Sequence, residues 1–371
     1  MDMTAIMRSD LQGNPNKHHN SVAGKALPAT PFGLIGQIGQ VKGRRQALLN
    51  EIVEQPECKS TNRHQELRRS LIQKQRAGQK ADEIVVADAE FSAHELLEFG
   101  DEDFVLRCAK NDTFCRAALK QRRGDRGRAC SRREVIRAMP KTWQNRVIAA
   151  SEPDACCEFV ILEERKDKVS GKRDMKAVTI KVKIWNDVRV NDTTIRECVK
   201  KGFKPEQIKR LRDKRLRVLV FEDPDFDTPW MLVTTLVEVE PVIIYQIYKD
   251  RWPVEGVPSV AKTILGGHRL FVHADDHPKR LPELILLGGN ILAVLAGAHE
   301  PTPTGFWDKQ PKATAGRLRR LLSKVGVDCF EANFAQLCKK QSVTAHLAAA
   351  RLAKRDPSLS NNRLKCEIIG I

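Results

Sequence analysis

The sequence predicts an α/β protein, and three features of its hydrophobic pattern support this prediction. Residues 84–87 form a short continuous apolar run, which is typical of a buried central strand. Ser92 and Glu95 then have the spacing of a capping box, which predicts that a helix follows this strand and ends at Gly100. Apolar residues recur at helical spacing over 241–265, which predicts a long helix in the second half of the chain.

The other elements follow from the same periodicities. Apolar runs over 31–40 and 47–53 lie on either side of the basic turn Lys42–Arg45 and predict a β-hairpin. Further strands are predicted over 104–109, 157–162, 177–185, 216–221 and 231–237, and further helices over 61–79, 193–215 and 281–298. The middle of the chain is therefore expected to be rich in β-structure.

The composition indicates a polyanionic partner. The 371 residues carry 64 Lys and Arg against 47 Asp and Glu, a net charge of +17, which favours nucleic acid over a merely basic protein. Aromatic residues make up only 5%, so contacts to duplex phosphates fit better than a stacking platform for single strands. Without an apolar run of eighteen residues or a signal peptide, we expect no membrane span and a cytoplasmic location.

Positive charge is concentrated in residues 110–146, which contain twelve Lys or Arg and only three acidic residues. Within this stretch the candidates for phosphate contacts are Arg126, Arg128, Arg132 and Arg133. The ten cysteines include no C-x-x-C pair, which favours reduced thiols over a zinc site or a disulfide framework.

Four functional side chains share one face of the helix predicted over 241–265. Tyr248, Arg251, Glu255 and Lys262 are separated by three, four and seven residues, which places them along that face. A carboxylate with a cation on each side suits a metal-binding glutamate with phosphate-binding neighbours, although a solvated charged face is the plainer interpretation. Trp252 is expected in the core, and Pro258 is expected to kink the helix.

Asp88 directly follows the buried run 84–87. The carboxyl end of such a strand, before a turn and a helix, is where open α/β sheets hold ligands. By itself, the residue is better explained as an aspartate that caps the turn.

These two motifs together resemble the DDE-type transposases of bacterial insertion sequences. The stretch IYKDRWPVE, extended to Lys262, is similar to the family's Tyr-Arg-Glu-Lys signature, and VVADAEF at 85–91 is similar to the sequence around its second catalytic aspartate. The resemblance covers about Pro28 to Leu322. It implies a ribonuclease-H-like mixed sheet with flanking helices, interrupted by a β-rich insertion between Asp88 and Glu255. The implied boundaries are 1–109 and 231–300 for the two parts of the catalytic core, 110–230 for the insertion and 301–371 for a basic helical tail.

The resemblance also implies three catalytic acids. Glu255 and Asp88 match the third and the second, and Asp2, followed by Thr4 and Arg8, matches the first best. The apolar strand that leads into the first acid is absent from the sequence, as are the family's upstream DNA-binding helices. We therefore expect a largely missing first strand, in a chain that begins at an internal methionine of a longer transposase.

The implied chemistry is Mg²⁺-dependent cleavage and transfer of DNA strands at element ends, with Mn²⁺ able to substitute. Asp88 and the first acid would share one ion, and Glu255 would hold the other. Arg251 and Lys262 would bind phosphates of double-stranded DNA, from transposon ends and target, and Tyr248 would either join them or pack the helix. A homodimer in a synaptic complex is implied. A truncated remnant that only binds DNA is the alternative, and the Tyr-Arg-Glu-Lys pattern disfavours a different ribonuclease-H-like nuclease.

Overall fold

The computed structural model describes residues 1–7, 17–20, 24–56, 62–117, 133–166, 173–267, 280–304, 308, 311–325 and 339–340. It is a mixed α/β protein, as the sequence predicts. The chain divides into two compact units, of which unit 1 comprises Met1–Gln79 and Lys249–Gln341. Unit 2 comprises Lys80–Tyr248, together with 342–371, which lie outside the described residues.

Unit 1 contains a five-stranded antiparallel sheet centred on the long strand β3 (Lys25–Val41). Its partners are β1 (Asp2–Met7), β2 (Lys17–Asn20), β4 (Arg44–Glu54) and β15 (Lys339–Lys340). Strands β3 and β4 form the predicted hairpin, with Lys42 and Gly43 at φ of 46° and 75° in its two-residue turn. Positive φ at both positions matches the right-handed twist of the strands, and glycine adopts it without strain.

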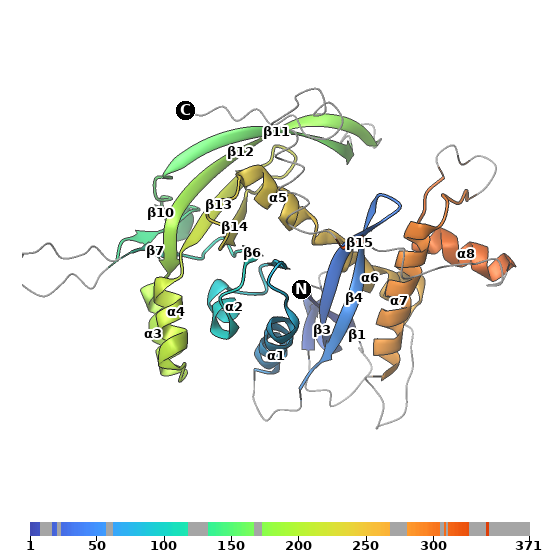
Figure 1. The fold of residues 1–371 in the computed structure, drawn as a ribbon, viewed down its shortest axis with the longest axis horizontal. Coiled ribbons are helices and arrows are strands. Elements are labelled where there is room, and N and C mark those ends of the chain that lie inside the picture. The colour runs from blue at the N-terminus through green and yellow to red at the C-terminus, as the bar shows by residue number, and fades with distance from the viewer. Residues whose placement is uncertain are drawn as a thin grey trace, which may run out of the picture. The chain divides into compact units, whose positions relative to one another are not determined.

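The helices of unit 1 are α1 (Arg63–Gly78), α6 (Trp252–Ser259), the π-helix η1 (Val260–Ile264), α7 (Arg280–Ala298) and α8 (Ala315–Val325) (Figure 1). Phe32 and Leu34 of β3 pack with Val254 and Val257 of α6 and with Leu286 of α7. This shared core fixes the start of α6 against the sheet.

Helix α7 is held in unit 1 by a buried asparagine and a close helix contact. The Asn290 side chain donates to the Ala47 carbonyl at 2.6 Å and accepts from the Leu49 amide at 3.1 Å. A Cβ on Gly289 would lie 3.0 Å from Ala261, so glycine is needed where α7 approaches η1. Among the described residues, α7 is the one helix long and apolar enough to span a membrane, and core helices meet the same criterion. The bounds of α7 agree with the helix predicted over 281–298.

Unit 2 is built on an eight-stranded mixed sheet. Its order is β5 (Val85–Ala87), β6 (Phe104–Arg107), β14 (Trp230–Thr234), β13 (Leu216–Glu222), β12 (Arg173–Val190), β7 (Phe114–Arg116) and β8 (Val135–Ile136), with β11 (Ala155–Lys166) also pairing with β12. Strands β5 and β6 are parallel and the other pairs are antiparallel. The strands predicted within 110–230 therefore join the same sheet as β5 and β6.

The helices of unit 2 are α2 (Ala93–Phe99), α3 (Asp192–Lys200), α4 (Pro205–Asp213) and α5 (Pro241–Lys249), and β9 (Lys141–Trp143) pairs with β10 (Arg146–Ile148). Helix α2 has the predicted capping box of Ser92 and Glu95. The hydrophobic core of unit 2 forms where α5 packs against the sheet. Tyr245 and Tyr248 of α5 contact Trp230 of β14 there.

Two sequence predictions about these elements are wrong. Strand β5 is an edge strand and not a central one, because within the described part of the chain it pairs with β6 alone. The helix predicted over 241–265 is broken at Asp250 and Arg251. Pro253 lies in the first turn of α6, where its missing amide hydrogen costs nothing, so the chain begins a new helix there.

A third expectation, the kink at Pro258, is replaced by a change of helix type. Pro258 lies inside α6, and the chain continues as the π-helix η1 from Val260. Proline has no amide hydrogen to complete the α-helical ladder, and π turns are one way in which helices absorb such a defect.

Candidate active site

Strand β1 places two polar side chains of unit 1 on one face of the sheet. Asp2 and Thr4 are two residues apart, so they point to the same side of the strand. Both are buried, and their register partners on β3 are Leu34 and Phe32. The sequence predicted that the strand of Asp2 would be largely missing, but β1 begins at Asp2 and continues to Met7.

The start of α6 brings a guanidinium to Asp2. Arg251 is the N-cap of α6, and Glu255 lies one turn further along the helix. The Arg251 side chain contacts the Glu255 carboxylate and lies 3.6 Å from Asp2 Oδ1. Arg251 is 4% exposed, the Asp2 side chain 11% and the Glu255 side chain 51%. One buried cation is thus shared by a mostly buried carboxylate and a half-exposed one.

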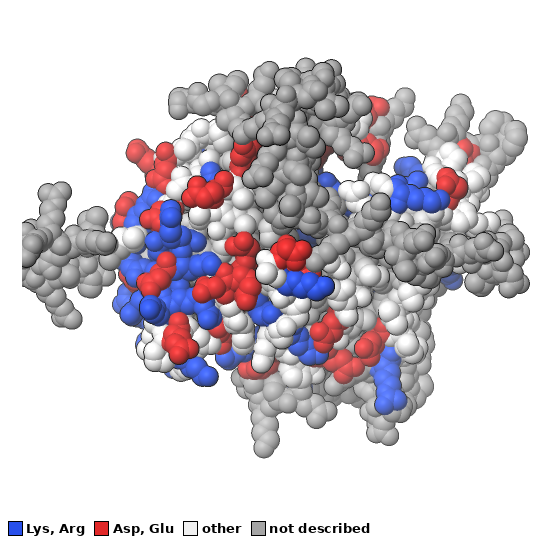
Figure 2. Space-filling model, in the orientation of Figure 1, with Lys and Arg blue, Asp and Glu red and all other residues white. Residues whose placement is uncertain are grey.

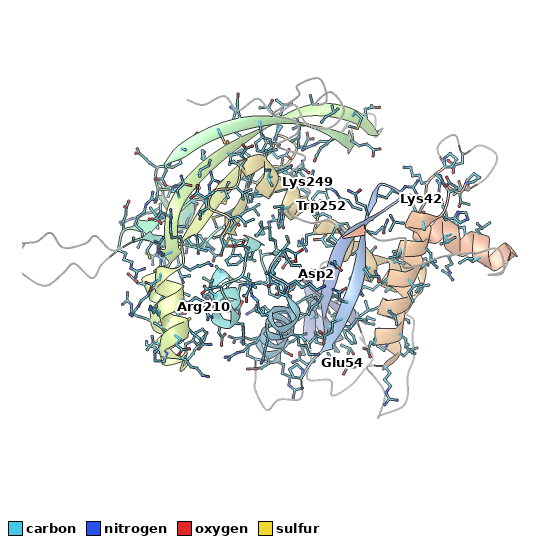
Figure 3. The ribbon with its side chains drawn as sticks, viewed as in Figure 1. Asp2, Lys42, Glu54, Arg210, Lys249 and Trp252 are labelled. Carbon is cyan, nitrogen blue, oxygen red and sulfur yellow. The ribbon has the colours of Figure 1, made fainter. Side chains whose placement is uncertain are left out.

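Lys262 completes the cluster from the π-helix η1. Its Nζ donates to Thr4 Oγ1 at 2.7 Å. Burial lowers the pKa of Lys262, and the nearby negative charge of Asp2 opposes that effect. Unit 1 therefore brings together four residues that the sequence singled out. Asp2 comes from the start of its first chain segment, and Arg251, Glu255 and Lys262 come from near the start of its second. Figure 3 labels Asp2 on β1.

Asp88 belongs to unit 2 and lies directly after β5. Its Oδ1 accepts a hydrogen bond from the Glu90 amide at 3.0 Å, and its carbonyl accepts from the Phe91 amide at 3.2 Å. This is the turn-capping role that the sequence offered as the plainer explanation. The carboxylate is partly exposed at the start of the turn that leads into α2.

The aromatic residues beside the signature lie in different settings. Tyr248 is the last buried residue of α5 and belongs to the core of unit 2. Its ring lies edge-on to that of Trp230, with ring centroids 6.0 Å apart. It therefore does not share a helix with Arg251. Trp252 was expected in the core, yet it is 44% exposed and stacks under the Lys249 ammonium group, 5.2 Å from the ring centroid.

Of the four arginines proposed for phosphate contacts, only Arg133 is described. Its guanidinium lies 3.6 Å from Asp192 and donates to the Arg212 carbonyl at 3.5 Å. The other three, Arg126, Arg128 and Arg132, lie outside the described residues, as does Arg8.

The sequence did not identify the partner of Lys262. The hydroxyl of Thr4 accepts its hydrogen bond across a separation of 258 residues, and the only hint was the two-residue spacing of Asp2 and Thr4 on a strand. The sequence also gave no sign of a second arginine cluster, in unit 2, where Arg165 donates to Asp223 at 2.6 and 2.7 Å.

The donor atoms of the unit 1 cluster suit a hard divalent cation. Carboxylate oxygens such as those of Asp2 and Glu255 are the ligands that Mg²⁺ prefers, and the exposure of Glu255 leaves it open to solvent. Arg251 supplies the positive charge between them in this structure. Among the described residues, no group of three or more His, Cys, Asp and Glu side chains is placed to hold a metal ion.

Comparison with known proteins finds no family whose model matches this sequence, and no curated protein matches it significantly.

Proposed function

We propose that this chain is a DNA transposase of the DDE type, which cleaves DNA at the ends of an insertion sequence and joins it to a target with Mg²⁺. The observation that supports the proposal best is the meeting of Asp2 and Glu255 at one guanidinium. The sequence singled out both residues, which are 253 positions apart, and nothing in their local sequences requires that they meet. Two carboxylates that reach the same guanidinium lie near each other, as acids that bind metal in one site must.

The proposed core is ribonuclease-H-like. Its support is the order of elements in each unit: an acid on the first strand, a hairpin after it, and a second acid directly after a short strand that leads into a capped helix. Asp2, the β3–β4 hairpin and Asp88 occur in that order.

The proposed reaction assigns a role to each side chain. Asp2 and Glu255 of unit 1 would hold Mg²⁺, which would supply activation of the attacking oxygen and stabilisation of the leaving one at phosphorus. The sequence resemblance alone gives Asp88 of unit 2 the same role. Arg251 would hold a phosphate of double-stranded DNA, for which its planar guanidinium offers two parallel hydrogen bonds. Lys262, through Thr4, would keep positive charge beside Asp2.

The contact between Arg251 and both carboxylates also favours a second candidate. A guanidinium that neutralises Asp2 and Glu255 can make the cluster a purely structural one. The chain would then be a DNA-binding protein related to transposases that does not cut.

Nicking of supercoiled plasmid in the presence of Mn²⁺ separates the two candidates. If the chain is a transposase, it nicks the plasmid, and Glu255→Gln, Asp2→Asn and Asp88→Asn each abolish nicking while DNA affinity changes little. Asn at position 88 can still accept the hydrogen bond from Glu90, so the turn is kept while the charge is lost. Glu283→Gln, on α7, is the matched control and should nick normally.

The outcomes discriminate clearly. DNA binding without any nicking by the folded wild-type chain would support the binding protein and exclude the transposase activity. Nicking that survives Glu255→Gln would remove Glu255 from the mechanism.

A further inference from the structure

Helices α3 and α4 of unit 2 form a basic helical pair. Residues 192–215 contain nine Lys or Arg against four Asp or Glu. In Figure 2, Lys and Arg side chains gather at the left of the view, over the end of unit 2 that carries α3, α4 and β10 in Figure 1. The function proposed above makes no use of this surface.

The inner face of the pair is fixed to the rest of unit 2. Ile195 of α3 and Leu211 of α4 are buried, and α4 contacts α3 and strand β12 of the sheet. The Arg210 side chain donates to the carbonyls of Leu97 and Glu98, at 2.9 and 3.1 Å, and so satisfies the C-terminal end of α2 (Figure 3 labels Arg210). The helical pair is therefore a rigid platform rather than a flexible basic arm.

The outer face carries cations without acidic partners. Six exposed side chains form no ion pair with any described residue: Arg196, Lys200, Lys201, Lys204, Lys209 and Arg212. Some exposed cations of unit 2 are paired instead, as Lys183 is with Glu222 at 2.6 Å and Arg215, just after α4, with Asp187 at 2.7 Å. Six cations without an ion pair to any described residue therefore lie within residues 196–212.

We infer that the outer face of α3 and α4 binds the phosphate backbone of duplex DNA, a contact that rests on the proposed function and lies outside its active site. Fixed cations one helical turn apart, such as Arg196 and Lys200, suit a regular array of phosphates. The one aromatic residue of the pair, Phe203, is partly buried, so single strands find no stacking surface there. Release of counterions from DNA would supply the free energy of binding.

The test is the salt dependence of binding to a fluorescent duplex of arbitrary sequence, measured by anisotropy with the full chain. The variant replaces Lys200, Lys201, Lys209 and Arg212 by Ala. Each lost phosphate contact reduces the slope of log affinity against log salt by about 0.9, so the four should reduce it by about 3 to 4. Between 50 and 200 mM salt, the wild type should then lose about 150-fold more affinity than the variant.

A matched control removes four exposed cations that are paired with carboxylates. Lys42, Lys74, Lys183 and Arg215 contact Glu300, Glu51, Glu222 and Asp187, respectively. Their replacement by Ala changes the net charge equally and should leave the slope nearly unchanged. A variant that exchanges Lys and Arg at the four test positions should keep the wild-type slope, which separates charge from folding.

Equal slopes for the test and control variants would overturn this inference, whether or not the chain nicks DNA. Conversely, a reduced slope in the test variant alone, together with no nicking by the wild type, would support the DNA surface and reject the proposed cleavage activity.

Discussion

Each unit places an arginine between carboxylates, but the carboxylate in closest contact with the arginine is buried in unit 2 and half-exposed in unit 1. In unit 2, Arg165 donates two hydrogen bonds to Asp223, whose side chain is 1% exposed. In unit 1, Arg251 contacts Glu255, whose side chain is 51% exposed, and lies a looser 3.6 Å from Asp2. Arg165 thus holds Asp223 away from solvent, although its second partner Asp225 is 43% exposed, whereas Arg251 makes its closest contact with a half-exposed carboxylate.

In the unit 2 cluster, Asp223 accepts a further hydrogen bond from a buried tyrosine. Tyr245 donates its hydroxyl hydrogen to Asp223 at 3.1 Å, and burial raises the pKa of Tyr245 above its ordinary value. Burial would raise the pKa of Asp223 too, but the hydrogen bonds from Arg165 outweigh it and the pKa of Asp223 is lowered. An aspartate with its hydrogen bonds satisfied in this way is suited to hold α5 on the sheet, whereas Glu255 in the unit 1 cluster stays half-exposed to solvent.

The largest effect is expected from breaking the unit 2 cluster. Arg165→Ala leaves Asp223 buried without its cation, which should reduce the free energy of unfolding by about 3–5 kcal/mol. Urea denaturation measures this loss. The control is Arg215→Ala, which breaks the exposed pair with Asp187 and should cost about 1 kcal/mol or less. If Arg165→Ala cost no more than the control, the contrast between the two clusters would be wrong.

A smaller effect is expected from opening the unit 1 cluster further. Arg251→Met removes the cation between Asp2 and Glu255, so their mutual repulsion should raise the affinity for Mn²⁺. An increase on the order of tenfold corresponds to about 1.4 kcal/mol of lost ion pairing. Electron paramagnetic resonance of free Mn²⁺ reports the affinity without any cleavage. Arg251→Lys keeps the charge and should change the affinity little, and an unaltered affinity in Arg251→Met would show that the carboxylates do not bind the ion.

The smallest effect concerns the pH dependence of unit 1. Because the pKa of Lys262 is lowered in the folded chain, the unfolded chain binds more protons between that lowered pKa and the ordinary value of 10.5. Stability should therefore rise with pH across this window. Lys262→Met removes the contribution, so the difference in unfolding free energy between wild type and variant should change from pH 7 to 10.5. A constant difference would contradict the burial of a charged Lys262.

Local signals in the sequence predicted local structure well. The capping box of Ser92 and Glu95 and the hairpin turn at Lys42 and Gly43 are confirmed, because each depends on residues a few positions apart. The short apolar runs in the sequence likewise predicted most of the strands of the unit 2 sheet.

Features that depend on distant parts of the chain could not be predicted in this way. The helical periodicity continues from Tyr248 to Lys262, but α5 packs in the core of unit 2 and α6 in that of unit 1, so the helix breaks between them. Trp252, next to that break, becomes exposed. The hydrogen bond from Lys262 to Thr4 joins residues 258 positions apart, which no periodicity reveals.

The division of unit 1 into two chain segments has a consequence for biosynthesis. Phe32 and Leu34 leave the ribosome long before Val254 and Leu286, which cover them. At about 5–20 residues per second, the intervening unit takes roughly 10 to 30 s to be made. During this interval the apolar face of β3 lacks the helices that cover it. Unit 2, whose described part runs from Lys80 to Tyr248, can fold as it emerges. The nascent chain therefore assembles the arginine cluster of unit 1 late, after that of unit 2.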